Sequence, residues 1–445
     1  MIFNIISLLI IIFSFVNYKK SFMIFLIYNM IWYDKLPFFS IGTVDVSSSI
    51  ILSFVYFMLY FVKGNVVNNP KCSIPFSFPF LMIIISYVGS CFTTLSVFYG
   101  EFYASISNIS RTILLFWLIW YVIEKKEDFE YIFHIISIMM LLACIYTFVE
   151  YFIGHNFLID LKNTATSKYN YINTYDSFGG SVSDSRGYRI SSIFEHPIGA
   201  GMTYALYSVV VFYLYVHYKF SFIKLKYLNF YLFVACLCIP CILLTKMRSS
   251  LLFYLLTLPS LLDFWNRRAF SFVLVSLLVF IVSLPFILSY VELFLSIFDS
   301  SSMYSAHGSN IEQRISQFNA ASSLMNESPF WGLGGNGKFK IDNVLTKAML
   351  GYESIWLDEM VSRGIFGVLA NVILATYTII IVPLKYNLKI IFWLSLSFWI
   401  TATLTSVPSF RFSLYYFVIF GFIKMSSYYK NIDSKKLTCT KFKLT

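Results

Sequence analysis

The sequence predicts an all-α, polytopic transmembrane helical bundle with about 12 or 13 spans and two large loops on one face. The prediction rests on composition, on long apolar stretches that recur along the chain, and on the basic residues placed between them. Of 445 residues, 58% are hydrophobic and only 12% are charged, whereas about 25% of residues are charged in soluble domains. Because the mean hydropathy is also high, at +0.73, the lipid bilayer is the expected solvent.

The apolar stretches have the length of about 20 residues that a helix needs to cross a bilayer. We predict helices at 2–17, 21–33, 47–63, 74–97, 108–123, 130–153, 197–217, 226–245, 248–265, 269–291, 361–383, 386–406 and 408–424. Tyr18, Lys19 and Lys20 interrupt the first apolar run, so the first two helices are short and the number of spans stays open. Residues 1–16 have no basic start and no small-residue cleavage site, so we expect this stretch to be retained.

Basic residues set the expected orientation, because short cytoplasmic loops are enriched in Lys and Arg. Strictly alternating helices put the following basic residues on one face: Lys63, Lys71, Lys125, Lys126, Lys219, Lys224, Lys226, Arg267, Arg268, Lys385, Lys389, Lys435, Lys436, Lys441 and Lys443. The expected regions are N-terminal helices at 1–153, a large loop at 154–196, central helices at 197–291, a second large loop at 292–360, C-terminal helices at 361–424 and a cytoplasmic tail at 425–445. Both large loops then share the opposite, non-cytoplasmic face.

The net charge of +11 does not indicate a nucleic-acid partner, because the basic residues lie in short clusters between apolar runs. Three of the seven cysteines, Cys236, Cys238 and Cys241, fall inside one apolar run. A zinc site needs polar surroundings through which the ion can enter, and hydrogen-bond partners for the residues that bind it. An apolar run offers neither, so we interpret these thiols as small buried hydrophobes. We expect no disulfide framework, no metal and no cofactor.

The second large loop has predicted structure of its own. Ser309 and Glu312 form a capping-box pattern, which begins an amphipathic helix at about 310–326 that lies on the membrane or packs on the bundle. Pro329 ends this region, and the glycine-rich stretch 332–337 predicts a turn that needs glycine's backbone freedom. We expect another short helix at 341–350, before the chain re-enters the membrane.

Charged residues collect at the non-cytoplasmic rim, where they are costly unless they pair or bind a ligand. These are Arg111, Arg186, Arg189, Glu195, His196, Lys246, Arg248, Arg314, Glu353, Asp358, Glu359, Arg363 and Arg411. Guanidinium groups keep their charge and bind phosphate in a planar, bidentate way, so converging arginines suit an anionic lipid pyrophosphate. For Arg111, Lys246 and Arg411 we favour the plainer role of a snorkelling anchor or a member of an ion pair in a loop.

Four groups of residues give a more specific signal through their order, spacing and shared face. They are RISSIFEHP at 189–197, leading into a helix through Gly199 and Gly201; TKMRSS at 245–250; EQR at 312–314 with PFWGLG at 329–334; and ESIWL at 353–357 with GIFG at 364–367. Together they resemble the O-antigen polymerase and ligase superfamily of bacterial surface-polysaccharide assembly. The resemblance covers about residues 185–370, whereas the first 180 or so residues add only a hydrophobic pattern.

The resemblance implies a GT-C-like, metal-independent, inverting glycosyltransferase that uses undecaprenyl-pyrophosphate-linked oligosaccharide. It implies a multi-pass protein of the bacterial inner membrane with its active site facing the periplasm. Family members of the polymerase kind work beside a flippase and a chain-length regulator, which are therefore expected partners together with the lipid bilayer.

The reaction needs positive charge at the leaving pyrophosphate and a base for the acceptor hydroxyl. Arg189, Arg248 and Arg314 match the family's motif arginines, and we assign them, with Arg186, to the pyrophosphate. We expect Arg189 and Arg314 to act in catalysis with Glu353, as base or as binder of the acceptor hydroxyl. The alternative for Glu353 is an acid that favours a helix N-terminus.

Two further residues are candidates for glycan contact. His196 precedes Pro197 at the mouth of a predicted helix, and Tyr188 belongs to a tyrosine-rich part of the first large loop. The competing interpretation of His196 is structural, as for many histidines beside a proline. The tyrosines are a weak signal because the chain contains 33 of them.

Three functions remain in competition. Ligases of the superfamily carry a His-Asn pair near the position of Glu353 and Ser354, whereas polymerases commonly carry Glu-Ser, so a repeat-unit polymerase is the first hypothesis. The ligase, which uses a lipid A core acceptor, is the nearest alternative. A flippase or other transporter is the third, and it is disfavoured because transporters tend to place charges near the midplane of symmetric halves.

Overall fold

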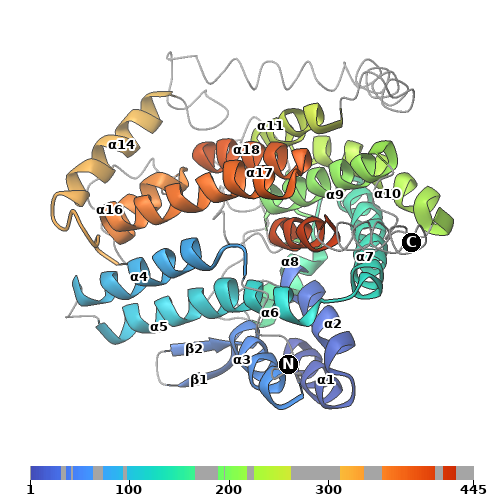
Figure 1. Ribbon diagram of the computed structural model, residues 1–445, viewed down its shortest axis with the longest axis horizontal. Helices are drawn as coiled ribbons and strands as arrows, with labels where there is room; N and C mark the ends of the chain where they lie inside the picture. Colours follow the sequence, from blue (N-terminus) through green and yellow to red (C-terminus); the bar gives the residue numbers. More distant parts are fainter. Residues whose placement is uncertain are drawn as a thin grey trace, which may run out of the picture.

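The computed structural model describes residues 2–31, 37–41, 44–63, 74–93, 98–165, 189–194, 196–217, 225–261, 311–334, 353–405 and 414–426 (Figure 1). These parts of the chain are mostly helical, with one short antiparallel pair of strands. The strands are β1, Pro37–Ile41, and β2, Val44–Ser47, with Phe39 opposite Val46. The chain is an all-α helical membrane protein, as the composition predicted.

The first part of the chain forms a series of short and long helices. They are α1 (Ile2–Val16), α2 (Tyr18–Ile31), α3 (Ser48–Lys63), α4 (Ser77–Thr93), α5 (Phe98–Ile109), a π-helical turn (Ser110–Leu114), α6 (Leu115–Val122), α7 (Lys126–Ile153) and α8 (Phe157–Ala165). The helix predicted from residue 108 thus begins ten residues earlier, at Phe98. Hydropathy missed its first turns because they carry polar residues, although Glu101 and Ser105 are buried.

The second part begins with α9, Pro197–His217, whose bounds match the prediction. The helices that follow are α10 (Leu225–Leu244), α11 (Arg248–Thr257) with a 3-10 turn (Leu258–Leu261), α14 (Ile311–Met325), α16 (Ile355–Thr376), a π-helical turn (Tyr377–Ile381), α17 (Val382–Tyr386), α18 (Lys389–Leu404) and a last helix, Leu414–Ser426. The predicted helices at 269–291 and 341–350 lie outside the described residues.

Helix α16 differs from its prediction in two ways. It begins at Ile355, so residues 355–360 are helical rather than part of the loop, and the helix is broken at Gly364, where φ is 62° and ψ is −155°. The early turns contain Asp358 and Glu359, which lowered the apparent hydropathy. Glu359 pairs with Arg363 one turn later, and this pairing allows both charged side chains to be buried.

Four of the described helical segments are long and apolar enough to cross a membrane. They are Glu101–Val122, Glu127–Ile153, Pro197–His217 and Ile355–Tyr386. The third, which is α9, is the most enclosed, with 83% of its apolar window buried, and it packs against α10 and α11. Helices α4 and α5 lie side by side, with α16 on the other side of α4 and α14 beside α16 at the left of Figure 1.

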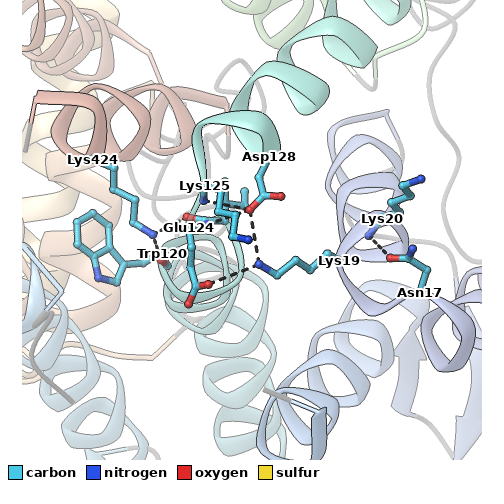
Figure 2. Close-up of polar contacts among 9 residues, drawn as sticks. Asn17, Lys19, Lys20, Trp120, Glu124, Lys125, Asp128 and Lys424 are labelled. Carbon is cyan, nitrogen blue, oxygen red and sulfur yellow. Dashed lines mark hydrogen bonds and ion pairs between the residues drawn. The ribbon is translucent and has the colours of Figure 1, made fainter. Parts of the chain in front are cut away.

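One end of the bundle, which we call the basic end, is held together by lysines (Figure 2). Lys19, in the first turn of α2, lies 3.5 Å from Glu124, which precedes α7, and 3.6 Å from Asp128 in the first turn of α7. Lys424 of the last helix donates hydrogen bonds to the carbonyl oxygens of Trp120 and Ile123. These carbonyls end α6 and carry partial negative charge, so a lysine stabilises them.

Candidate functional site

The directions of α9 and α18 follow from their contacts with the basic end. Tyr213, near the end of α9, contacts Phe422 of the last helix with ring centroids 5.8 Å apart. Tyr386, just before α18, accepts a hydrogen bond from Ser426 at 3.3 Å. Helix α9 therefore ends at the basic end, whereas α18 begins there and runs away from it to Leu404.

Helix α11 runs in the same direction as α9. In the first turn of α11, Ser250 donates a 3.5 Å hydrogen bond to the carbonyl of Ile198 in the first turn of α9. In the 3-10 turn that follows α11, the carbonyl oxygen of Ser260 lies 3.3 Å from the ring of His217, the last residue of α9. Arg248, the first residue of α11, and Leu404, the last of α18, therefore both lie opposite the basic end, at what we call the motif end.

Small residues allow the first two motifs to fit together at the motif end. A Cβ atom added at Gly201 would contact the hydroxyl of Ser250 and would lie 2.9 Å from Oγ1 of Thr245. Between them, Lys246 has a left-handed backbone with φ of 51°. The stretch 245–250 therefore turns sharply and starts α11 directly against α9.

The third and fourth motifs meet at the last residues of α18. Arg314 of α14 donates a 3.1 Å hydrogen bond to the carbonyl of Leu404. Trp356, in the first turn of α16, donates a 2.9 Å hydrogen bond to Thr403, and its ring stacks on Trp399 at 5.5 Å. Helix α14, the start of α16 and the end of α18 thus come together at the motif end.

Arg314 and Glu353, two predicted site residues, form an ion pair. Arg314 Nη2 lies 3.6 Å from Glu353 Oε2, which is longer than a hydrogen bond. Their side chains are 31% and 39% exposed. One turn along α14, the buried Gln317 accepts a 3.2 Å hydrogen bond from the backbone N–H of Glu353. Helix α14 thus fixes the backbone of Glu353 while the two charges stay accessible to a ligand.

The other predicted site residues are placed less completely. Arg189 and Arg248 are half-buried, and Arg248 shares the motif end with Arg314. Arg186 and Tyr188 lie outside the described residues. His196 is exposed, and its Nδ1 accepts the backbone N–H of Ile198 at 3.1 Å. That contact caps the start of α9, which gives the histidine a structural role.

Sequence reasoning placed Glu359 and Arg363 at the rim, but the structure buries both. The side chains are 3% and 9% exposed, and the carboxylate accepts two hydrogen bonds from the guanidinium. The guanidinium also lies over the ring of Tyr87, 4.0 Å from its centroid. The four-residue spacing of the two charges in one helix is the signal that could have predicted this pairing.

A feature that the sequence did not predict is a clasp between the PFWGLG segment, 329–334, and the broken part of α16, 361–366. Leu333 and Gly334 donate backbone hydrogen bonds of 2.8 and 2.9 Å to Val361 and Ser362. The rings of Trp331 and Phe366 stack at 4.4 Å. We call this arrangement the glycine clasp.

Glycine is required on both sides of the clasp. Gly332 and Gly364 have φ values of 71° and 62°, in the left-handed region that other residues avoid. A Cβ added at Gly332 would strike the backbone of Arg363. Because the clasp directly follows α14, it holds α14 beside α16, with Arg314 and Gln317 next to Glu353.

The thiols and the other metal-binding side chains were also located. Cys238 and Cys241 are buried, as predicted, but the prediction for Cys236 is wrong because its side chain is exposed on the outer side of α10. Residues separated by two positions in a helix have side chains that point about 200° apart, so Cys236 and Cys238 lie on opposite faces of α10. Among the described residues, no group of three or more His, Cys, Asp or Glu could hold a metal ion.

The fold and the motif end define a multi-pass helical membrane protein that gathers charged motif residues at one end of its bundle. Residues 231–372 match a family model described as O-antigen ligase. The matched stretch includes Arg248, Arg314 and Glu353, together with the glycine clasp. It supports the O-antigen polymerase and ligase superfamily, and with it a glycosyl-transfer type of enzyme, without separating polymerase from ligase. No curated protein matches the chain.

Proposed function

We propose that the protein is an O-antigen polymerase. It transfers the growing glycan from undecaprenyl pyrophosphate to the non-reducing end of the next lipid-linked repeat unit, at the periplasmic face of the inner membrane. The observation that carries the proposal is the half-exposed pair of Arg314 and Glu353 at the motif end. The superfamily match over the same residues supports it.

In this proposal Glu353 acts on the acceptor and Arg314 acts on the leaving pyrophosphate. The acceptor hydroxyl passes its proton to Glu353 while its oxygen bonds to the anomeric carbon from the face opposite the leaving group. The bond from that carbon to the pyrophosphate oxygen breaks, and the pyrophosphate leaves with the bonding electrons. Arg314, with Arg189 and Arg248, stabilises the negative charge that develops there.

The geometry of the pair suits an exchange of partners. At 3.6 Å the guanidinium of Arg314 is near enough to Glu353 to offset its charge, and this contact is longer than a hydrogen bond. A phosphate can therefore attract the guanidinium.

The proposal is tested with purified protein in lipid nanodiscs, supplied with synthetic lipid-linked repeat units, by measuring the ladder of polymer lengths. Arg314→Ala is expected to lower the rate by about 100-fold to 1000-fold, the usual effect of removing a donor that stabilises a developing anion. Arg314→Lys keeps the charge but loses the planar fork, so we expect an intermediate rate. Asn319→Ala, an exposed change on the same helix, is the control.

The same assay tests the carboxylate. Glu353→Gln keeps the shape and the backbone hydrogen bond to Gln317 but cannot accept the proton, so the rate should fall by about 100-fold or more. Glu327→Gln, an exposed change just after α14, is the matched control. Full activity of correctly inserted Arg314→Ala or Glu353→Gln protein would show that the proposed site is wrong.

The second candidate is the ligase, which the description of the matching family favours. Cells that lack the protein separate the two. Single-repeat lipopolysaccharide would support the polymerase, whereas complete polymers stranded on undecaprenyl pyrophosphate would support the ligase. Polymerisation by the purified protein, without any translocation step, would exclude a transporter as the sole function despite the broken helix α16.

A further inference from the structure

The turn that carries Arg189 is held by a buried carboxylate far from it in the sequence. Glu150, near the end of α7, is 1% exposed. Its Oε1 accepts the backbone N–H of Ser191 at 3.1 Å, and its Oε2 accepts that of Ser192 at 2.7 Å. A buried carboxylate is costly unless hydrogen bonds satisfy it, so this one fixes two consecutive backbone groups.

Ser192 is fixed through its other polar atoms as well. Its hydroxyl donates to the carbonyl of Ala143 at 2.9 Å and accepts from the hydroxyl of Tyr204 at 3.0 Å. Its carbonyl accepts from the side chain of Asn156 at 2.8 Å. Contacts from α7, from the stretch before α8 and from α9 therefore converge on one residue.

The backbone of Ser192 shows what these contacts achieve. Its φ of 56° lies in the left-handed region, which a serine seldom adopts. Such a conformation persists only where the surroundings over-determine it, and it is often found beside functional sites. The network holds the turn in one conformation that the chain alone would not favour.

Arg189 lies two residues before Ser191 and one before Ile190, whose side chain is 1% exposed. With Ile190 buried and the N–H groups of Ser191 and Ser192 held, the backbone at Arg189 is anchored, and its side chain is half-buried. Helix α7 has Asp128 in its first turn, at the basic end, and Glu150 near its other end. The anchor thus lies on the same side as the motif residues.

We propose that Glu150 is a positioning residue for Arg189. Its carboxylate sets the backbone of the turn at 189–192 so that the guanidinium faces the pyrophosphate of the lipid-linked donor. The inference rests on the proposed function, because it gives Glu150 an effect on donor binding only through Arg189. The sequence alone shows Glu150 as a single acid near the end of an apolar helix.

The test is a double-mutant cycle in the nanodisc polymerisation assay. Glu150→Gln keeps the shape, but its amide NH₂ faces a backbone N–H that needs an acceptor. In the wild-type background we expect KM for the lipid-linked donor to rise about tenfold, as for coupled neighbours, with a smaller change in kcat. In the Arg189→Lys background, which has already lost the bidentate fork, the same change should have less than about a twofold effect.

Controls separate positioning from folding. Glu127→Gln removes an exposed acid from the same helix and should change neither constant. Glu150→Asp keeps the charge but is one methylene shorter, so it cannot hold both backbone N–H groups in the same geometry and should also raise KM. It provides the readout if Glu150→Gln does not insert into the membrane.

The results that would overturn the positioning role of Glu150 differ from those that would overturn the proposed function. Equal losses from Glu150→Gln in both backgrounds, or a loss in kcat alone, would overturn the positioning role and leave the polymerase proposal intact. If Glu150→Gln is not inserted, an unchanged KM in Glu150→Asp would overturn it equally. Full activity in Arg189→Ala would instead remove Arg189 from the proposed pyrophosphate site, and the inference about Glu150 would fall with it.

Discussion

Two arginine–glutamate pairs in this protein differ in every respect that matters for chemistry. Arg363 and Glu359 lie one turn apart on α16, are joined by two hydrogen bonds and are 9% and 3% exposed. Arg314 and Glu353 come from separate segments, stand 3.6 Å apart and are 31% and 39% exposed. The first pair is closed on itself, whereas the second, which we call the open pair, is joined by a longer contact and is partly exposed.

The comparison teaches that a charge near the rim of a membrane bundle does not by itself indicate a binding site. Arg363 also has the ring of Tyr87 on one face, so its guanidinium is already occupied by groups of the protein. Replacing those contacts with a phosphate would leave Glu359 buried without its partner. The closed pair is expected to stabilise the fold, and the open pair is expected to serve the reaction.

The largest expected effect comes from breaking the closed pair. Arg363→Met leaves the carboxylate of Glu359 uncompensated in a buried position, which should lower the free energy of unfolding by about 3–5 kcal/mol. Thermal unfolding of the detergent-purified protein measures this loss. Adding Glu359→Leu to Arg363→Met removes the stranded charge and should recover much of the stability. Equal unfolding temperatures for the single and double variants would contradict a closed, mutually compensating pair.

A smaller effect is expected from the glycine clasp, which connects the two pairs through α14 and α16. At Gly364 a Cβ atom would lie 2.6 Å from the carbonyl oxygens of Pro329 and Phe330, and φ is 62°. Gly364→Ala should therefore lower the stability by about 1–3 kcal/mol and lower activity further, because α14 would no longer be held beside Glu353.

The control for the clasp is Gly199→Ala, where an added Cβ meets nothing within 4 Å. It should leave the unfolding temperature unchanged or slightly raised, because alanine is the better helix former. If Gly364→Ala and Gly199→Ala behave alike in unfolding and in polymerisation, the clasp does not position the open pair.

The sequence predicted the parts of this fold that depend on local hydropathy. The apolar run between Pro197 and His217 gave the bounds of α9, and the spacing of Ile315 and Phe318 in α14 gave a helix within one residue at each end. The start of α5 was missed because its inward face carries the polar Glu101. The break in α16 was missed because it depends on contacts with 329–334, which hydropathy does not encode.

The candidate site also contains residues that the sequence identified and residues that it did not. Arg314 and Glu353 were identified from motif resemblance, and the structure brings them together. Their pairing could not be derived from spacing, because it depends on how the clasp orients α14. Glu150 was missed entirely, because an acid within an apolar helix gives no sign that its partners are backbone groups of a turn some 40 residues later. Whether Arg189 and Arg248 join Arg314 at one ligand remains a prediction.

The smallest expected effect concerns the contribution of the open pair to folding. Because both side chains are about one-third exposed, water and salt screen their attraction, and exposed pairs contribute about 0.2–1 kcal/mol. A double-mutant cycle of Arg314→Ala and Glu353→Gln, followed by thermal unfolding, should give a coupling energy in this range that falls as salt is added. The two changes nevertheless remove groups that the proposed reaction needs.

The two kinds of measurement should therefore rank the pairs in opposite orders. Unfolding should be sensitive to Arg363 and nearly insensitive to Arg314, whereas the rate of polymerisation by the folded protein should fall by about 100-fold or more when Arg314 is lost. A coupling energy of several kcal/mol between Arg314 and Glu353 would mean that this pair, too, is a structural lock. In that case the two pairs would not differ in kind, and the charge for the leaving pyrophosphate would have to come from another arginine at the motif end.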